Sequence, residues 1–343
     1  MLSLSDPRTP LPSDLLDQPG AFLWWYVDVR GEGGDGLVLI WSFGLPFLPD
    51  LSGAPRSRPS INLATYRRGR PDLYLLQEQD PDRVSWDPQG RWAFEDSRLW
   101  WERDEHRLRL HAELDLEVPG SDDRLAARIE LEGARARLEG TPEPGEHAWA
   151  PLTGVSTAQA TLRHGSWSQT LQGSGYHDRN ACTRPYAELG VRDWVWGRAA
   201  LGDRQLIWYL VEGEGREDRV VMVEADGRVR DLGRPRVKLP GTRRDLYGLR
   251  WAPRIELELD GEHIEIVQDP PAEHGPFYLR HPVSASGSLG AGTGWGELVS
   301  VDQLHRPWQA PFVRMRVHRR REDSFWLPLF TGPRAGRLSR LLR

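Results

Sequence analysis

The feature that most constrains this chain is a series of short stretches in which apolar and polar residues alternate. Residues 107–110 and 113–116 carry leucine at every second position. A period of two places alternate side chains on opposite faces of a β-strand, so these stretches predict half-buried strands. Residues 37–41 are continuously apolar and follow a glycine-rich turn, which is typical of a strand buried on both faces.

Turn residues between these stretches indicate tight antiparallel hairpins. The dipeptides Asp226-Gly227 and Asp260-Gly261 are two-residue turn signals flanked by apolar strand patterns. Helical spacing is scarce and is found mainly at Leu338, Leu341 and Leu342. Many hairpins in two blocks predict an all-β fold of two closed or nearly closed antiparallel barrels, which removes exposed sheet edges.

Composition excludes several classes of protein. The chain has 343 residues, enough for two domains, and one cysteine, which rules out a disulfide framework and suits a reducing cytoplasm. The mean hydropathy is -0.58. A membrane helix requires about 20 consecutive apolar residues, and no apolar run approaches that length. The first ten residues show no secretory signal pattern. A net charge of -5 argues against nucleic-acid binding, whereas 16 tryptophans suggest a pocket for a large apolar or π-rich ligand.

Residues 173–201 concentrate polar and aromatic side chains of chemical interest. If Tyr176 and Asp178 lie on a strand, they share one face, and Trp194 and Trp196 share a face for the same reason. A carboxyl group that faces aromatic rings is poorly solvated, which raises its pKa and keeps it protonated as a potential acid. The alternative is a buried structural aspartate that caps a turn.

Several motifs along the chain occur in an order and spacing typical of one protein family. They are Trp24-Trp25-Tyr26-Val27-Asp28, Asn62-Leu63-Ala64-Thr65-Tyr66, Glu146-His147-Ala148-Trp149-Ala150-Pro151, Gly175-Tyr176-His177-Asp178-Arg179-Asn180, Arg192-Asp193-Trp194-Val195-Trp196-Gly197-Arg198, Gly275-Pro276-Phe277-Tyr278-Leu279-Arg280 and Glu297-Leu298-Val299-Ser300-Val301-Asp302. With these motifs the chain resembles the carotenoid 1,2-hydratase (hydroxyneurosporene synthase) family. It departs from the family pattern at residues 181–184, where the family has a Trp-Gly-acidic run.

The resemblance implies a fold and a reaction. The fold is two lipocalin-like (calycin-type) β-barrel domains, residues 1–185 and 186–343, with the central motif at their junction. The reaction is the addition of water to the terminal C1=C2 double bond of an acyclic carotenoid of the lycopene or neurosporene type. It proceeds by acid catalysis through a tertiary carbocation, and we expect neither a cofactor nor a metal.

The family's functional pairs map onto His147, Trp149, Tyr176 and Asp178. We expect Asp178 to deliver the proton, and the rings of Tyr176 and Trp149 to stabilise the carbocation. We expect His147 to orient the water or to hydrogen-bond Asp178, although the residues alone are more typical of a loop histidine beside a proline. The residues expected to contact the substrate are Trp25, Asn180, Trp194 and Trp196.

Two other functions stay open, and so does the cellular setting. One alternative is an isoprenoid or polyketide cyclase or pericyclase of the same fold, and the other is a non-catalytic carotenoid or lipid carrier. We expect a cytoplasmic protein that associates peripherally with anionic membranes, because its substrate dissolves in lipid and residues 314–343 are rich in arginine. A solvated terminal segment is the alternative interpretation of those arginines.

Rival chemistries have weaker support in the sequence. None of the ten histidines forms a H-E-x-x-H pattern and no C-x-x-C pair exists, so we expect no metal site. Residues 287–294 are glycine-rich but lack the G-K-[S/T] ending of a phosphate-binding loop, so we predict an ordinary loop there. Cys182 is expected to be a small buried side chain rather than a reactive thiol.

Overall fold

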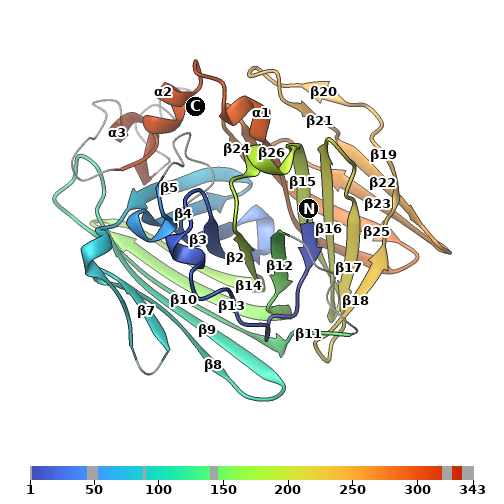
Figure 1. The fold of residues 1–343 in the computed structure, drawn as a ribbon, viewed down its shortest axis with the longest axis horizontal. Coiled ribbons are helices and arrows are strands. Elements are labelled where there is room, and N and C mark those ends of the chain that lie inside the picture. Colours follow the sequence, from blue (N-terminus) through green and yellow to red (C-terminus); the bar gives the residue numbers. More distant parts are fainter. Residues whose placement is uncertain (1, 45–52, 88–89, 140–145, 319–326, 334–343) are drawn as a thin grey trace.

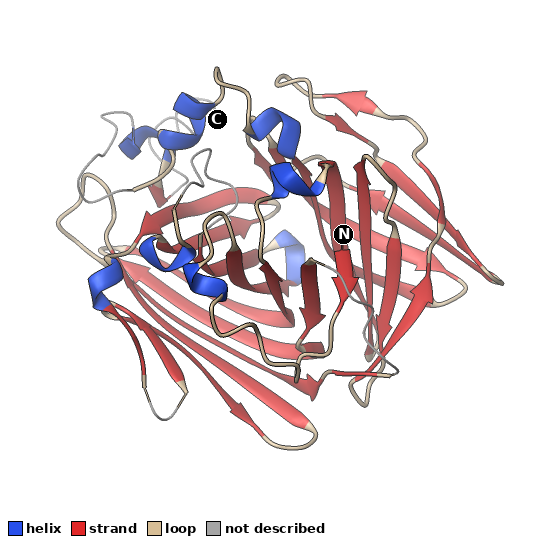
Figure 2. Cartoon of the chain, viewed as in Figure 1, coloured by secondary structure: helices blue, strands red, loops and turns tan. Residues whose placement is uncertain are grey.

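The computed structural model describes residues 2–44, 53–87, 90–139, 146–318 and 327–333. The chain is nearly all β, as predicted, and forms two large curled sheets and one small two-stranded sheet (Figure 2). Figure 1 shows the two large sheets packed against each other, each curled into half a barrel. In the described part of the chain, no helix is long and apolar enough to cross a membrane.

Within the described ranges, the first sheet has 14 strands. They are β1 (Leu2–Leu4), β2 (Phe22–Gly31), β3 (Gly36–Phe43), β4 (Pro59–Arg67), β5 (Arg70–Glu78), β6 (Val84–Trp86), β7 (Arg91–Phe94), β8 (Ser97–Arg103), β9 (Arg107–Leu116), β10 (Leu125–Arg135), β12 (His147–Pro151), β13 (Thr153–His164), β14 (Trp167–Cys182) and β27 (Gly332–Pro333). Their order is β27-β5-β4-β3-β2-β14-β13-β10-β9-β8-β7-β6, while β12 pairs with β14 and β1 pairs with β12. Short turns join most neighbours, so hairpins build most of the sheet.

The second sheet has 11 strands among the residues that the structure describes, in the order β11-β18-β17-β16-β15-β26-β25-β23-β22-β19, and β24 pairs with β25. They are β11 (Arg137–Leu138), β15 (Val191–Leu201), β16 (Arg204–Gly213), β17 (Arg219–Val223), β18 (Arg228–Gly233), β19 (Arg236–Lys238), β22 (Arg254–Leu259), β23 (Glu262–Gln268), β24 (Glu273–His274), β25 (Tyr278–Gly287) and β26 (Gly290–Ser300). The small sheet pairs β20 (Arg243–Arg244) with β21 (Arg250–Trp251). The α-helices are α1 (Val301–Leu304), α2 (Ala310–Arg314) and α3 (Leu327–Phe330), and the 3-10 helices are η1 (Leu15–Asp17), η2 (Glu32–Gly34), η3 (Pro55–Ser57), η4 (Pro81–Arg83) and η5 (Tyr186–Leu189).

Both predicted hairpins are confirmed, but only Asp260-Gly261 forms a two-residue turn, since residues 224–227 connect the strands around Asp226-Gly227. Asp226-Gly227 lies between β17 and β18, and Asp260-Gly261 joins β22 to β23. The glycine-rich run 287–294 is not the loop we predicted, because β25 ends at Gly287 and β26 starts at Gly290. Inside β26, a Cβ atom at Gly294 would lie 1.8 Å from the carbonyl oxygen of Arg198, so close strand packing explains this glycine.

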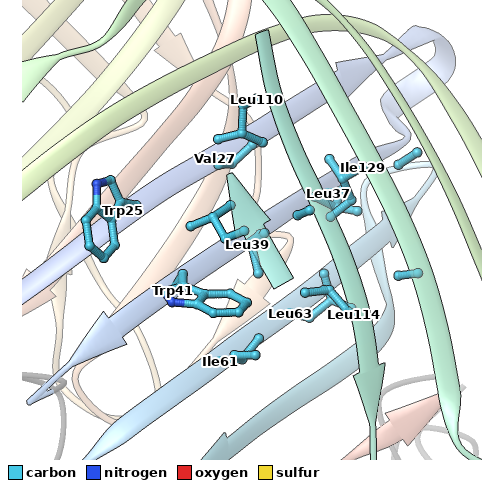
Figure 3. Close-up of a cluster of buried hydrophobic side chains, with 14 of the residues drawn as sticks. Trp25, Val27, Leu37, Leu39, Trp41, Ile61, Leu63, Leu110, Leu114 and Ile129 are labelled. Atoms are coloured by element: carbon cyan, nitrogen blue, oxygen red, sulfur yellow. The ribbon is translucent and has the colours of Figure 1, made fainter. Parts of the chain in front are cut away.

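Among the described residues, three large apolar cores and a small fourth cluster around Leu279 fill the interior, and strands near the centre contribute to two of the large cores. Trp25 and Val27 of β2 point into the concave face of the first sheet, in the cluster drawn in Figure 3. Trp24 and Tyr26, from the same strand, point the other way, into a layer between the two sheets. The third core, around Trp208, lies within the curl of the second sheet. Burial on both faces explains why β2 has an almost continuous apolar sequence.

The two sheets exchange short strands. β11 precedes residue 185 and pairs with β18 in the second sheet, whereas β27 follows it and pairs with β5 in the first sheet. The division into domains 1–185 and 186–343 therefore stays a prediction about folding units. The helical spacing at Leu338, Leu341 and Leu342, and most of the arginine-rich segment 314–343, lie outside the described residues.

A buried ion pair links the two sheets. The guanidinium group of Arg198 on β15 contacts the carboxylate of Asp28 on β2, and both side chains are completely buried. We expect Arg198→Met to lower the free energy of unfolding by about 3–5 kcal/mol, because it leaves the Asp28 charge buried without a partner. The double variant with Asp28→Asn should recover part of that loss in chemical denaturation. Equal destabilisation of the single and double variants would contradict this account.

Candidate active site

The candidate site lies in the layer between the sheets, near the end of β14. Tyr176, Asp178 and Asn180 follow one another at a spacing of two, so their side chains share one face of the strand. β12 runs antiparallel to β14, with Trp149 opposite Asn180. This register brings the side chains of His147 and Trp149 beside the three residues of β14.

The carboxyl group of Asp178 accepts three hydrogen bonds. Trp149 Nε1 donates to Oδ2 over 2.9 Å, and the Tyr176 hydroxyl donates to the same oxygen over 3.0 Å. Asn180 Nδ2 donates to Oδ1 over 3.0 Å. Asp178 is only 2% exposed. Both carboxyl oxygens are therefore held in a fixed orientation, away from bulk water.

Asn180 connects this carboxyl group to His147. Its Oδ1 atom lies 2.8 Å from Nε2 of His147. In this orientation the histidine donates Nε2–H to the amide oxygen, while the amide nitrogen donates to Asp178. If the Asn180 amide were turned by 180°, its oxygen would accept a hydrogen bond from the O–H of neutral Asp178, and its NH₂ group would donate one to His147. The structure thus places Asn180, which we predicted to contact substrate, between the two candidate proton carriers.

Burial sets the charge of Asp178. Removal from water raises the pKa of Asp178 to about 8, although hydrogen bonds from Trp149 and Tyr176 act to lower it. The nearby carboxylates of Glu297 and Asp28 raise it further, because a second negative charge is unfavourable there. At neutral pH the carboxyl group is therefore mainly protonated, as the aromatic surroundings predict.

His147 is neutral in the same pH range. Burial lowers the pKa of His147 to about 4, and the hydrogen bond to Asn180 only partly opposes this effect. The Tyr186 hydroxyl lies 3.4 Å from His147 Nε2. A neutral imidazole beside a protonated carboxyl is an arrangement in which one group can donate a proton and the other can accept one.

The second sheet supplies aromatic rings to this layer. The Trp196 ring lies 5.6 Å from that of Tyr176, and the Trp194 ring lies 4.6 Å from that of Tyr186. Tyr209 of β16 presents its ring edge-to-face to Trp149, with the centroids 5.7 Å apart. Trp194 and Trp196, two positions apart on β15, therefore lie on one face of the strand, as predicted, and that face borders the site.

Trp25 is the one predicted site residue that the structure places elsewhere. It points into the concave core of the first sheet, where its ring packs against those of Trp92 and Trp101. His177 lies on that same side, accepting a hydrogen bond from Trp101 Nε1 over 2.9 Å and bonding the Tyr26 carbonyl through Nδ1. The alternation along β2 and β14 therefore separates these residues from Asp178.

Tyr186, Tyr209 and Glu297 border the site but are not among the residues predicted from the sequence. Glu297 Oε1 accepts hydrogen bonds from the Tyr26 hydroxyl, over 2.9 Å, and from Arg280 Nε, over 3.1 Å. The alternation of residues in β16 predicts that Tyr209 shares a strand face with the residues two positions away. It does not predict which of the two faces of β16 meets the first sheet.

The chain departs from the family pattern at residues 181–184. One of these residues, Cys182, has its side chain in the layer between the sheets. Cys182 is buried beside His147, to which it lies opposite in the β12–β14 register. Burial raises the pKa of Cys182 to about 11, so it is a protonated, packed side chain, as predicted. Arg184 lies at the surface and pairs with Glu146.

The spaces within the layer are small. A cavity of about 10 Å³ beside His147 is lined by Tyr186, Trp194 and Tyr209, among others, and is close to the size needed for one water molecule. A second cavity, of about 50 Å³, lies near Tyr74 and Arg280. The end group of a long ligand can reach Asp178 only if side chains of this layer move. Among the described residues, no three His, Cys, Asp or Glu side chains gather to hold a metal ion.

Comparisons with known proteins agree with the order of the motifs. A family model described as carotenoid hydratase CrtC matches residues 50–326. A Chlorobaculum tepidum protein named hydroxyneurosporene dehydrogenase is 26% identical over 316 residues, which cover 80% of each chain. The acyclic carotenoid 1,2-hydratase of Thiocapsa roseopersicina is 27% identical over 332 residues, covering 91% of this chain and 77% of the other.

A solved structure supports the fold alone. An AttH protein of Nitrosomonas europaea superposes with a TM-score of 0.59 at 15% identity, covering 85% of this chain and 98% of that chain. The sequence matches carry the family assignment, since the family model spans most of the chain and includes the strands that hold His147, Trp149, Tyr176 and Asp178. The protein therefore belongs to the carotenoid hydratase CrtC family.

Proposed function

We propose that this protein adds water to the terminal C1=C2 double bond of an acyclic carotenoid. The observation that carries the proposal is the protonated carboxyl group of Asp178 in an aromatic layer. An isolated trisubstituted alkene requires a proton donor, and a carboxyl group with a pKa of about 8 retains its proton at neutral pH. The names of relatives in this family support the same substrate class and reaction.

The reaction balances without another reagent. Asp178 delivers its proton to C2, the less substituted carbon, and the π electrons form the new C–H bond. The positive charge then resides on C1 as a tertiary carbocation. A water oxygen bonds to C1, and the proton that the water loses returns to the enzyme. The carboxyl group of Asp178 is protonated again at the end of the cycle.

Aromatic rings stabilise the cation in this proposal. Trp149 and Tyr176 hydrogen-bond Asp178 directly, so their rings would lie close to a double bond that receives the proton of Asp178. Trp194, Trp196 and Tyr209 complete the surroundings from the second sheet. A cation over a desolvated ring gains about 2 kcal/mol or more, whereas the neutral alkene gains little, so such contacts favour the carbocation over the substrate.

In this proposal His147 and Asn180 act in the second step of the reaction, the addition of water to the carbocation. The small cavity beside His147 has room for about one water molecule. Neutral His147 can accept a proton from that water, and the amide of Asn180 links its imidazole to Asp178. We propose that His147 orients the water and that Asn180 positions His147 and Asp178 relative to each other.

The observations weigh against the two alternatives to different degrees. A passive carrier requires no protonated carboxyl group, so the surroundings of Asp178 favour an enzyme. A proton-initiated cyclase would need the same acid, and the hydrogen bonds to Asp178 do not separate the two reactions. The water-sized cavity and the names of the relatives favour hydration. We also propose a cytoplasmic protein that works without a cofactor and associates peripherally with membranes.

Asp178→Asn tests the acid. Asparagine has nearly the same size and keeps hydrogen-bonding atoms, but it has no acidic proton. We expect hydration of lycopene to fall about a hundredfold or more while the variant stays folded. Wild-type activity should decline as the pH rises through about 8, because only neutral Asp178 donates. A stable variant that still hydrates lycopene would exclude Asp178 as the acid.

Stability provides an independent test of the Asp178 pKa. The pKa of Asp178 is about 8 in the folded state, against 3.8 for an ordinary aspartate. Between these values the folded state binds more protons than the unfolded state, so stability falls as pH rises. Relative to Asp178→Asn, the wild type should lose about 1.4 kcal/mol per pH unit across this interval. Parallel pH profiles of the melting temperatures would show that Asp178 has an ordinary pKa.

Two substitutions at Trp149 separate its hydrogen bond from its ring. Trp149→Phe removes the N–H donor that lowers the pKa of Asp178, so the decline in activity should move to higher pH. Trp149→Leu also removes the ring, and we expect kcat to fall about thirtyfold for about 2 kcal/mol of lost stabilisation.

Trp101→Phe is the matched control, because Trp101 donates to buried His177 on the opposite face. It should leave the pH profile unchanged. Normal kcat with a raised KM in Trp149→Leu would show that the ring only shapes the pocket, an outcome that favours the carrier.

A further inference from the structure

Two projecting segments with exposed apolar side chains lie on one edge of the molecule. The first segment, residues 239–250, follows β19 and includes β20. The second, residues 301–314, includes α1 and α2. Figure 1 shows both along the top edge, and residues of both line one cavity of about 530 Å³. We refer to the two segments together as the rim.

The rim exposes large apolar side chains on a hydrogen-bonded turn and beside short helices. Leu246 is fully exposed, at 102%, on a turn in which Asp245 Oδ1 accepts hydrogen bonds from the backbone N–H groups of Tyr247 and Leu249. On the second segment, Trp308 is 50% exposed and its ring lies 6.3 Å from that of Phe312. Water is an unfavourable environment for such a group of side chains, so their clustering indicates a surface that contacts something apolar.

The rim is also positively charged in a chain whose net charge is -5. Its exposed arginines are Arg243, Arg244, Arg250, Arg306 and Arg314. The same two segments contain two acidic residues, Asp245 and Asp302. Within the part of the chain that the structure describes, none of the five arginines forms an ion pair. Arginines beside exposed tryptophan and leucine match the boundary of an anionic bilayer, where headgroups attract the cations and apolar side chains enter the lipid.

The rim lies next to the candidate active site. Trp194 and Val211 line both the 530 Å³ cavity and the small cavity beside His147. A surface that contacts the membrane at this position would bring a lipid-dissolved molecule to the side of the layer that contains Asp178.

We infer that the rim is a docking surface for anionic lipid bilayers. The inference deepens the proposed membrane association and is independent of the chemistry of Asp178. The occupant is a bilayer because two separate segments together carry five exposed arginines and five exposed apolar side chains, namely Leu239, Leu246, Tyr247, Trp308 and Phe312. Docking would place the mouth of the 530 Å³ cavity toward the headgroups.

The test is flotation of the full chain with vesicles of phosphatidylcholine, with and without phosphatidylglycerol, in the absence of carotenoid. We expect binding to the anionic vesicles that weakens as salt rises. Replacing Arg244 and Arg306 with Gln should reduce partitioning about twenty-fivefold, since each cation near the surface contributes about fivefold. Leu246→Ser with Trp308→Ser should reduce it at least about tenfold.

Matched control variants replace the same types of residue at exposed positions outside the rim. Trp86→Ser alters another half-exposed tryptophan, on β6, and Arg98→Gln with Arg163→Gln removes two exposed arginines from the first sheet. Both controls should float like the wild type. Rim variants that float like the wild type, or controls that lose binding equally, would overturn the inference.

A further variant separates the rim from the arginine-rich terminus. Ending the chain near residue 321 would remove buried Leu327 and strand β27, so substitution is the better choice. In this variant Gln replaces Arg334, Arg337, Arg340 and Arg343. Retained binding supports the rim, whereas loss of binding only in this variant assigns attachment to the terminus and overturns the inference. If the wild type binds no vesicle, both the docking role of the rim and the proposed membrane association are wrong. That result would not affect the hydratase proposal, which the Asp178 variants test separately.

Discussion

Burial of the central strands on both faces is the constraint on which the rest of the structure depends. β2, β14 and β15 each have one face in the core of their own sheet and one face in the layer between the sheets. Groups in the middle of the inter-sheet layer are therefore shielded from water, as the exposed fractions of Asp28 (0%) and Asp178 (2%) show. Polar groups within it must find partners in the protein, and Asp28, Asp178, Asn180 and Arg198 all do so.

The same constraint supplies the chemistry. A carboxyl group is usually ionised at neutral pH because water solvates its charge, but Asp178 has three neutral hydrogen-bond donors in place of water. Those donors lower its pKa less than burial raises it. The fold thus keeps the carboxyl group that we propose as the proton donor protonated at neutral pH, and it surrounds that group with rings from both sheets.

Much of this architecture could be predicted from the sequence, because strand alternation and turn residues are local signals. The hairpins at Asp226-Gly227 and Asp260-Gly261, and the common face of Tyr176 and Asp178, follow from spacing alone. The face of β2 that meets the site does not, since Trp24 and Trp25 are adjacent and both faces of that strand are apolar. Tyr209 and Glu297 reach the layer through contacts between sheets that are distant in sequence, and no local pattern encodes such contacts.

The three hydrogen bonds that fix the Asp178 carboxyl group also have a stereochemical consequence. A carboxyl group held by Trp149, Tyr176 and Asn180 cannot turn to present its proton to both faces of a planar double bond. In heavy water, the proposed hydration would place a single deuterium at C2 in one configuration only. The handedness of that carbon would then record which side of the bound polyene faces β14.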